Sequence, residues 1–186
     1  MSTNSSICML RKNGKVSGVY CHWDGYVEYN GAMLTKHYKD PSKVDELISL
    51  GSISSLGEVI IDDIVKKYGF DYQYNPLAKE EYTEEELDNC KSTIAYHRDR
   101  GEELEISNFD SIKDFYSYLS TYGTREFTYL YIEEENEWYL LEYYKYPKEE
   151  INLRKLYFDE NEEINVSENF KYYFLDDLVE HHSIGN

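Results

Sequence analysis

Two short segments of the sequence combine residue types that can perform acid–base or nucleophilic chemistry. Cys21-His22-Trp23-Asp24 follows one apolar run, and His97-Arg98-Asp99-Arg100 follows another. Brought together by a fold, such residues would supply a nucleophile, a general base and a cationic clamp for an anion. One hypothesis is therefore a small hydrolase-type enzyme with a site formed by His22, Asp24, His97 and Arg98.

The spacing of these residues matches no established catalytic motif. The sequence contains no P-loop, no HExxH zinc motif, no nucleophile elbow and no dinucleotide-binding glycine fingerprint. The simpler interpretation is that residues 21–23 pack at the end of a strand, while Arg98 and Arg100 pair with nearby carboxylates. We favour this interpretation, so we expect no catalytic residue and no enzymatic activity.

The cysteines and histidines give no convincing cofactor or metal site. Cys8, Cys21 and Cys90 are an odd number, lie far apart and form no CxxC pair. Disulfide frameworks need paired cysteines in an oxidising compartment, and zinc sites need clustered ligands. His181-His182 is a weak metal signal, because adjacent residues on a helix point in different directions. We expect reduced thiols, no cofactor and no metal.

Carboxylates form a second kind of candidate site, one that binds a partner. The 186 residues include 37 Asp and Glu and 19 Lys and Arg, which gives a net charge of −18. Residues 1–70 carry eight acidic and eight basic residues, so the whole excess lies in residues 71–186. Solubility needs a charge of only about 2–8, and a larger one destabilises a compact fold by repulsion. The excess suggests a functional role, although charge runs are also typical of ordinary solvated surfaces.

The acidic excess is concentrated in four clusters. On a continuous helix, Glu80, Glu84 and Asp88 would lie on one face, at i, i+4 and i+8. The other three clusters fall in predicted turns and loops. The predicted partner-binding residues are Glu80, Glu84, Asp88, Glu102, Glu103, Glu105, Glu133, Glu134, Glu135, Glu137, Asp159, Glu160, Glu162 and Glu163.

Composition excludes several other classes of protein. Aromatic residues make up 16% of the chain, with 21 Tyr, which argues against a disordered acidic tail. The acidic charge opposes direct binding of the free protein to duplex DNA. No stretch approaches the roughly 18 apolar residues of a membrane span, and residues 1–10 lack the apolar core of a signal peptide. We expect a cytoplasmic protein that contacts no membrane, and the sequence gives no oligomeric state.

The predicted strands form two hairpins. Residues 6–12 and 15–23 flank Asn13-Gly14, which is typical of a two-residue type I′ turn. Residues 126–132 and 138–144 are rich in β-branched and aromatic residues and form the second predicted pair. Residues 92–97 and 153–158 are further candidate strands, and residues 98–101 are expected to form a turn.

Hydrophobic periodicity predicts helices over residues 27–38 and 170–182. Residues 58–68 fit either a helix or a strand, and the helical period is favoured. Asp40 and Pro41 mark the start of another helix, which Gly51 ends, and Ser111 with Asp114 resembles a capping box. Residues 71–86 are expected to form a loop or a short acidic helix. The sequence thus predicts a single α+β domain over residues 1–186, with a mostly antiparallel sheet packed against about four helices.

The segment Tyr20-Cys-His-Trp-Asp-Gly-Tyr26 resembles a family of small proteins from bacteriophages and mobile elements. Residues 31–38 (GAMLTKHY), 43–57 (KVDELISLGSISSLG) and 94–103 (IAYHRDRGEE) also match its pattern. Val27 departs from it, because many members have Pro there. Most members are uncharacterised, so the resemblance supplies no catalytic residues and implies only a phage-type context.

In a phage-type context, a small acidic protein is similar to inhibitors of host defence nucleases. We predict a non-enzymatic, stoichiometric inhibitor, a DNA mimic that binds the basic nucleic-acid channel of a nuclease complex. The partner would be a basic protein or ribonucleoprotein, and by analogy an anti-CRISPR role against a Cas9-type effector with its guide RNA is the sharper prediction. The small enzyme described above, and a regulatory protein-binding domain unrelated to defence, remain the alternatives.

Overall fold

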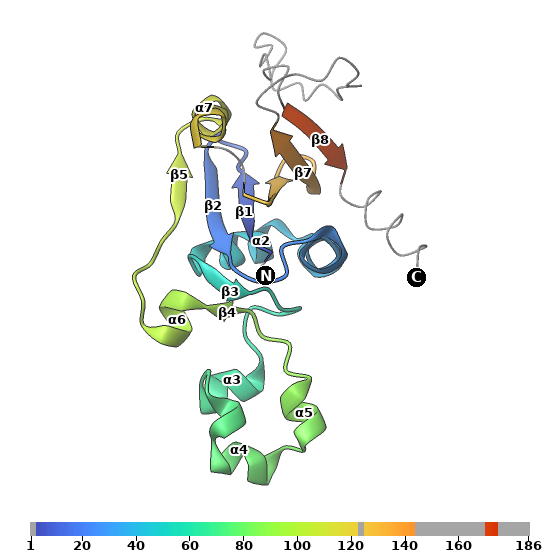
Figure 1. Cartoon of the computed structure of the whole chain (residues 1–186), viewed down its shortest axis with the longest axis vertical. Coiled ribbons are helices and arrows are strands. Elements are labelled where there is room, and N and C mark those ends of the chain that lie inside the picture. The colour runs from blue at the N-terminus through green and yellow to red at the C-terminus, as the bar shows by residue number, and fades with distance from the viewer. Residues whose placement is uncertain (1–2, 123–124, 144–169, 175–186) are drawn as a thin grey trace.

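A mixed eight-stranded sheet forms the centre of the protein (Figure 1). The computed structural model describes residues 3–122, 125–143 and 170–174. The strand order is β4-β3-β2-β1-β6-β7-β8, and β5 pairs separately with β2. The strands are β1 (Ser5–Leu10), β2 (Val16–Cys21), β3 (Ile53–Ser55), β4 (Ile94–Ala95), β5 (Ser107–Phe109), β6 (Phe127–Ile132), β7 (Glu137–Tyr143) and β8 (Phe170–Phe174).

Most strand pairs in this sheet are antiparallel. Only β1–β6 and β2–β3 are parallel, among the seven pairings of the described strands. The predicted α+β class with a mostly antiparallel sheet is therefore confirmed. The N-terminal and C-terminal hairpins are joined through the parallel contact between β1 and β6, which aligns Ser5 with Phe127.

Seven short α-helices accompany the sheet in the described residues. They are α1 (Ala32–His37), α2 (Pro41–Ser49), α3 (Asp63–Tyr68), α4 (Pro76–Glu81), α5 (Glu84–Asp88), α6 (Tyr96–Arg100) and α7 (Ile112–Tyr122), with a π-helical turn η1 (Val27–Gly31) and a 3₁₀ turn η2 (Tyr72–Tyr74). The predicted caps are confirmed. The Asp40 side chain accepts a hydrogen bond from the Ser42 amide, and Ser111 Oγ accepts one from the Asp114 amide.

The two faces of the sheet are covered by different helices. Alternate side chains of β1 point to opposite faces, so Ile7 and Met9 join one core and Cys8 and Leu10 join the other. Helix α2 packs on the first face, while α7 covers only part of the second (Figure 1). No helix in the described ranges is long and apolar enough to cross a membrane.

Residues 62–90 form a helical lobe that projects beyond the β3–β4 edge of the sheet (Figure 1). The lobe comprises α3, η2, α4 and α5. It has a small core of its own, made of Ile64, Val65, Tyr72, Ala78 and Leu87. Since α4 and α5 are separate, the prediction that Glu80, Glu84 and Asp88 share one helical face is wrong. Thr83 interrupts that face by starting α5 with a capping box to Glu86.

The turn of the N-terminal hairpin differs from the prediction. The Gly14 amide donates to the Arg11 carbonyl, and Arg11 and Lys15 close the loop around residues 12–14. Gly14 has φ 82°, whereas the φ of Asn13 is not positive. A type I′ turn needs positive φ at both central residues. The connection is therefore a three-residue loop, in which Gly14 alone takes the left-handed conformation.

Three other predicted elements are shortened or replaced. The helix predicted over residues 58–68 begins only at Asp63, because Asp62 caps it. The strand predicted over residues 92–97 is limited to β4, and the turn predicted over residues 98–101 is the end of helix α6, which Gly101 terminates with φ 69°.

The C-terminal prediction fails where the structure describes it. The segment Phe170–Phe174 is strand β8, which pairs with β7, and not the start of a helix. A run of five residues rich in aromatic side chains fits the periods of both a helix and a strand. Here pairing with the edge of β7 favours the strand. The strand predicted over residues 153–158, the acidic residues Asp159, Glu160, Glu162 and Glu163, and His181-His182 lie outside the described residues.

Candidate functional site

The fold brings the two predicted catalytic segments to neighbouring strands. Cys21 pairs with Ile53 of β3, and Ile53 pairs in turn with Ala95 of β4. The His22 amide continues this ladder by donating to the Ile53 carbonyl at 3.1 Å. Only strand β3 therefore lies between β2 and β4, the two strands from which the two segments continue.

The side chains of these segments are nevertheless occupied by local contacts. His22 Nδ1 lies 2.9 Å from the Tyr20 hydroxyl, and its ring packs edge-on against Trp23. Asp24 has φ 56° at the turn after β2. His97 Nδ1 lies 2.7 Å from the Glu102 carbonyl oxygen. Packing and turn formation account for these contacts, as the simpler interpretation predicts.

Arg98 has a structural role that joins the helical lobe to the sheet. Its guanidinium donates to both carboxylate oxygens of Asp99, and also to the backbone carbonyls of Ile60 and Thr93. Residues 60 and 93 belong to the two connections that lead into and out of the lobe. The predicted carboxylate partner is confirmed for Arg98.

Arg100 differs from the prediction. Its guanidinium lies over the rings of Tyr96, at 4.9 Å, and Phe70, at 5.2 Å, and it donates to Ser54 Oγ at 3.3 Å. Within the described ranges it makes no ion pair. Cation–π contacts therefore take the place of the expected carboxylate.

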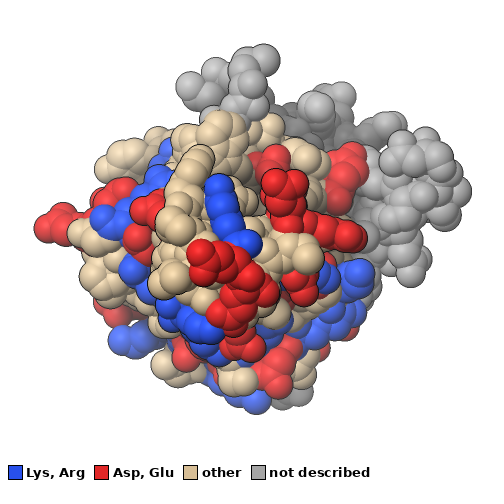
Figure 2. Space-filling model, turned by 90° about the horizontal axis from the view of Figure 1, so that it is seen from below, with Lys and Arg blue, Asp and Glu red and all other residues tan. Residues whose placement is uncertain are grey.

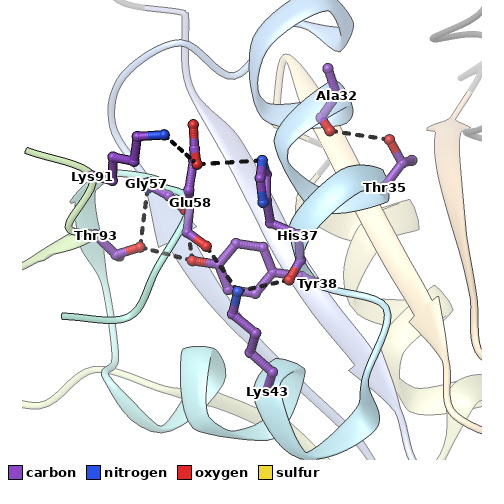
Figure 3. Close-up of polar contacts among 9 residues, drawn as sticks. All are labelled: Ala32, Thr35, His37, Tyr38, Lys43, Gly57, Glu58, Lys91 and Thr93. Carbon is purple, nitrogen blue, oxygen red and sulfur yellow. Dashed lines mark hydrogen bonds and ion pairs between the residues drawn. The ribbon is translucent and has the colours of Figure 1, made fainter. Parts of the chain in front are cut away.

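A polar junction centred on Glu58 links residues of the same two connections (Figure 3). Glu58 Oε2 lies 2.9 Å from Lys91 Nζ and 3.9 Å from His37 Nε2. The hydrogen bond from Lys91 holds the pKa of Glu58 below its ordinary value. Burial lowers the pKa of His37, and the nearby Glu58 carboxylate opposes this shift. A carboxylate with a lowered pKa is a weak base, so the junction is better suited to anchoring than to proton transfer.

Beneath Glu58, buried groups satisfy each other's hydrogen bonds (Figure 3). The Tyr38 hydroxyl donates to the Gly57 carbonyl at 2.7 Å and lies 3.1 Å from Thr93 Oγ1, which accepts from the Gly57 amide. Lys43 Nζ donates to the carbonyls of His37 and Glu58, both at 2.8 Å. The sequence patterns did not predict this junction, because no short-range spacing connects residues 37, 58 and 91.

The buried thiols are unsuited to nucleophilic or metal chemistry. Burial raises the pKa of Cys8 to about 12 and that of Cys21 to about 11. A thiol becomes a nucleophile or metal ligand as its thiolate, which such values suppress. In the part of the chain that the structure describes, no group of three His, Cys, Asp or Glu residues is placed to hold a metal ion.

The described acidic clusters lie on separate parts of the molecule. Glu80, Glu84 and Asp88 belong to the helical lobe, and residues 102–105 follow α6. Glu133 lies beside the β1–β2 loop, where it accepts a hydrogen bond from the Lys12 amide at 2.8 Å. Since β2 runs from that loop to β3, the β6–β7 turn and the lobe lie toward opposite ends of the molecule (Figure 1). The structure therefore does not bring these two clusters together.

The helical lobe carries the strongest candidate interface. It contains nine acidic and three basic residues. Two of its apolar side chains are unusually open to solvent, Tyr74 at 81% and Leu77 at 62%. Figure 2 views this end of the molecule and shows acidic residues interleaved with Lys and Arg. The exposed lobe carboxylates for which the described residues provide no ion pair are Asp71, Glu80, Glu84, Glu85, Glu86 and Asp88.

Comparison with known proteins gives no identification. No family model matches the chain, and no curated protein or solved structure is significantly similar to it. Function is therefore inferred from the sequence and from the geometry of the described residues.

Proposed function

We propose that this chain is a non-enzymatic inhibitor that uses its helical lobe to bind a basic surface of a partner protein. The observation that carries the proposal is the combination of unpaired carboxylates with the exposed Tyr74 and Leu77 on one projecting lobe. Protein interfaces favour such aromatic anchors, and complementary charge accelerates association. A partner with an apolar pocket surrounded by Arg and Lys would match both features.

The nucleic-acid channel of a nuclease is a surface of this kind. RNA-guided effectors hold their heteroduplex in a positively charged channel and read a short adjacent motif with arginines. The sharper form of the proposal is an anti-defence role in the host cytoplasm of a phage or mobile element, directed at a Cas9-type complex. The local engagement of His22, His97 and Arg98 supports a binding protein over the alternative enzyme.

A DNA-cleavage assay with a Cas9–guide RNA complex tests the proposal directly. Increasing amounts of the protein should stop cleavage near one molecule per complex. Inhibition should weaken as the salt concentration rises from about 50 to 500 mM, because screening reduces the attraction between exposed charges. Inhibition far below equimolar amounts would indicate a catalyst, and salt-independent inhibition would contradict electrostatic docking.

Matched charge variants test the role of the lobe. Neutralising Glu80, Glu84 and Asp88 to Gln or Asn should reduce inhibition by at least about tenfold, a loss of about 1.4 kcal/mol. The control neutralises Glu102, Glu103 and Glu134, which removes the same charge outside the lobe. An equal loss in both variants would show that overall charge, not the lobe, attracts the partner.

A further inference from the structure

A cleft lies on the sheet face that α7 only partly covers. It has a volume of about 270 Å³ and is bounded by β1, β2, β5 and α7. This volume is close to the lower limit of small-molecule pockets, about 300 Å³. We call it the α7 cleft. It is separate from the helical lobe, so ligand binding in the cleft is independent of the proposed function.

One wall of the α7 cleft is a continuous series of aromatic rings. Phe109 lies 5.3 Å from both Phe115 and Tyr118, and Tyr118 lies 4.9 Å from Tyr122, measured between ring centroids. Tyr118 and Tyr122 are exposed, at 43% and 75%. Large aromatic side chains so open to solvent at the rim of a cleft provide surfaces on which a planar ring can stack.

Gly18 of β2 lines the floor of the cleft. Gly18 pairs with Cys8 of β1 and with Ser107 of β5. A Cβ atom at position 18 would lie 2.6 Å from Cys8 Sγ, so a larger residue would displace the Cys8 side chain. The Cys8 side chain thus fills the space beside Gly18, and the polar residues Ser6 and Ser107 also line the cleft.

Arg125 supplies a cation at the cleft. Its guanidinium lies 5.1 Å from the centroid of the Tyr20 ring, and both residues line the cavity. Across the described residues, Arg125 forms no ion pair with a carboxylate. The neighbouring Glu126 accepts a hydrogen bond from Asn4, and Asp110 pairs with Lys15. In a chain with a net charge of −18, an arginine without a carboxylate partner is noteworthy.

We propose that the α7 cleft binds a small planar aromatic anion. The ring would stack along Tyr118 and Tyr122 above Gly18, and the anionic group would bind the Arg125 guanidinium. Arginine binds carboxylates and phosphates strongly through charge-assisted hydrogen bonds. The size of the cleft limits the ligand to a single aromatic carboxylate or a nucleoside monophosphate. The overall acidity of the protein also repels longer polyanions.

Titrations followed by backbone NMR test this proposal with paired probes. The anionic probes are 4-hydroxybenzoate and adenosine monophosphate, and their uncharged counterparts are 4-hydroxybenzamide and adenosine. Inorganic phosphate tests the charge without a ring. At least one anionic probe should shift the amide signals of Gly18 and Ser107, and its uncharged counterpart should bind about tenfold more weakly. Phosphate alone should leave these signals unchanged.

Variants separate the cleft from general charge effects. Arg125→Gln should weaken binding of the anionic probe about tenfold, and Tyr122→Ser should weaken both members of a pair. Lys113→Gln also removes one positive charge, but from an exposed position on α7 outside the cleft, and it should leave binding of the anionic probe unchanged. The proposal is wrong if neither anionic probe shifts Gly18, if the uncharged counterparts bind equally well, or if Lys113→Gln weakens binding as much as Arg125→Gln.

Discussion

Arg98 and Asp99 are adjacent in sequence, and their side chains form a two-fold hydrogen-bonded ion pair, with Nε and Nη2 each 2.8 Å from a carboxylate oxygen. The same carboxylate accepts from the Ala95 amide at 2.7 Å. Only 5% of the Asp99 side chain is exposed. The pair therefore fixes the start of α6 against both connections of the helical lobe.

Replacing Arg98 should consequently destabilise the protein. Arg98→Ala removes the guanidinium that donates to the buried Asp99 carboxylate and to two backbone carbonyls, and we expect a loss of about 3 kcal/mol in the free energy of unfolding. Urea denaturation measures the loss. The control is Arg11→Ala, which removes a more exposed ion pair with Asp45 and should cost less than about 1 kcal/mol. Similar losses in both variants would contradict the anchoring role of Arg98.

The hydroxyl of Tyr38 provides a second test of the junction beneath the lobe. Tyr38 is fully buried, and its hydroxyl donates to the Gly57 carbonyl. Tyr38→Phe keeps the ring and removes the hydroxyl, which also contacts Thr93 Oγ1, so we expect a loss of about 1–3 kcal/mol in the free energy of unfolding. Thermal or urea unfolding gives the value. The matched exposed change, Tyr74→Phe, should alter stability by less than about 0.5 kcal/mol, and a Tyr38→Phe variant as stable as this control would show that the bond is dispensable.

Stability should fall as the pH decreases through the range in which His37 titrates. The pKa of His37 is lower in the folded protein than its ordinary value of 6.5, mainly because of burial. The unfolded chain therefore binds the proton first, so the stabilising effect is complete above pH 6.5 and is lost as the pH falls toward the folded pKa. His37→Gln should flatten the dependence of the melting temperature on pH just below 6.5. An unchanged dependence in this variant would exclude His37 as the source.

The three cysteines should differ in reactivity toward a thiol reagent such as DTNB. Cys90 is partly exposed, whereas Cys8 and Cys21 are buried and have raised pKa values. The folded protein should therefore react at one thiol, and all three should react in denaturant. Cys90→Ser should abolish the reaction of the folded protein. Reaction of a second thiol before unfolding would contradict the burial of Cys8 or Cys21.

Short-range signals in the sequence determined several elements correctly. Asp40 and Pro41 start α2, Ser111 starts α7, and the aromatic and β-branched runs form β6 and β7. A capping hydrogen bond spans two or three residues, and strand alternation needs only a few more. Thr83 and Glu86 carry the same kind of signal, and their capping box is the local feature that separates α4 from α5.

The arrangement of the site depended on contacts that no local pattern encodes. The parallel pairing of β1 with β6 joins residues more than a hundred positions apart, and the Glu58 junction brings together side chains of residues 37, 58 and 91. The sequence alone determined the composition, the large acidic excess, the strand pairs of both hairpins and the starts of α2 and α7. Only the tertiary structure decided that Arg98 anchors the lobe, that the Glu133 and Glu84 clusters lie apart, and that Gly18 and Arg125 line one cleft, because burial and long-range packing define each of these relationships.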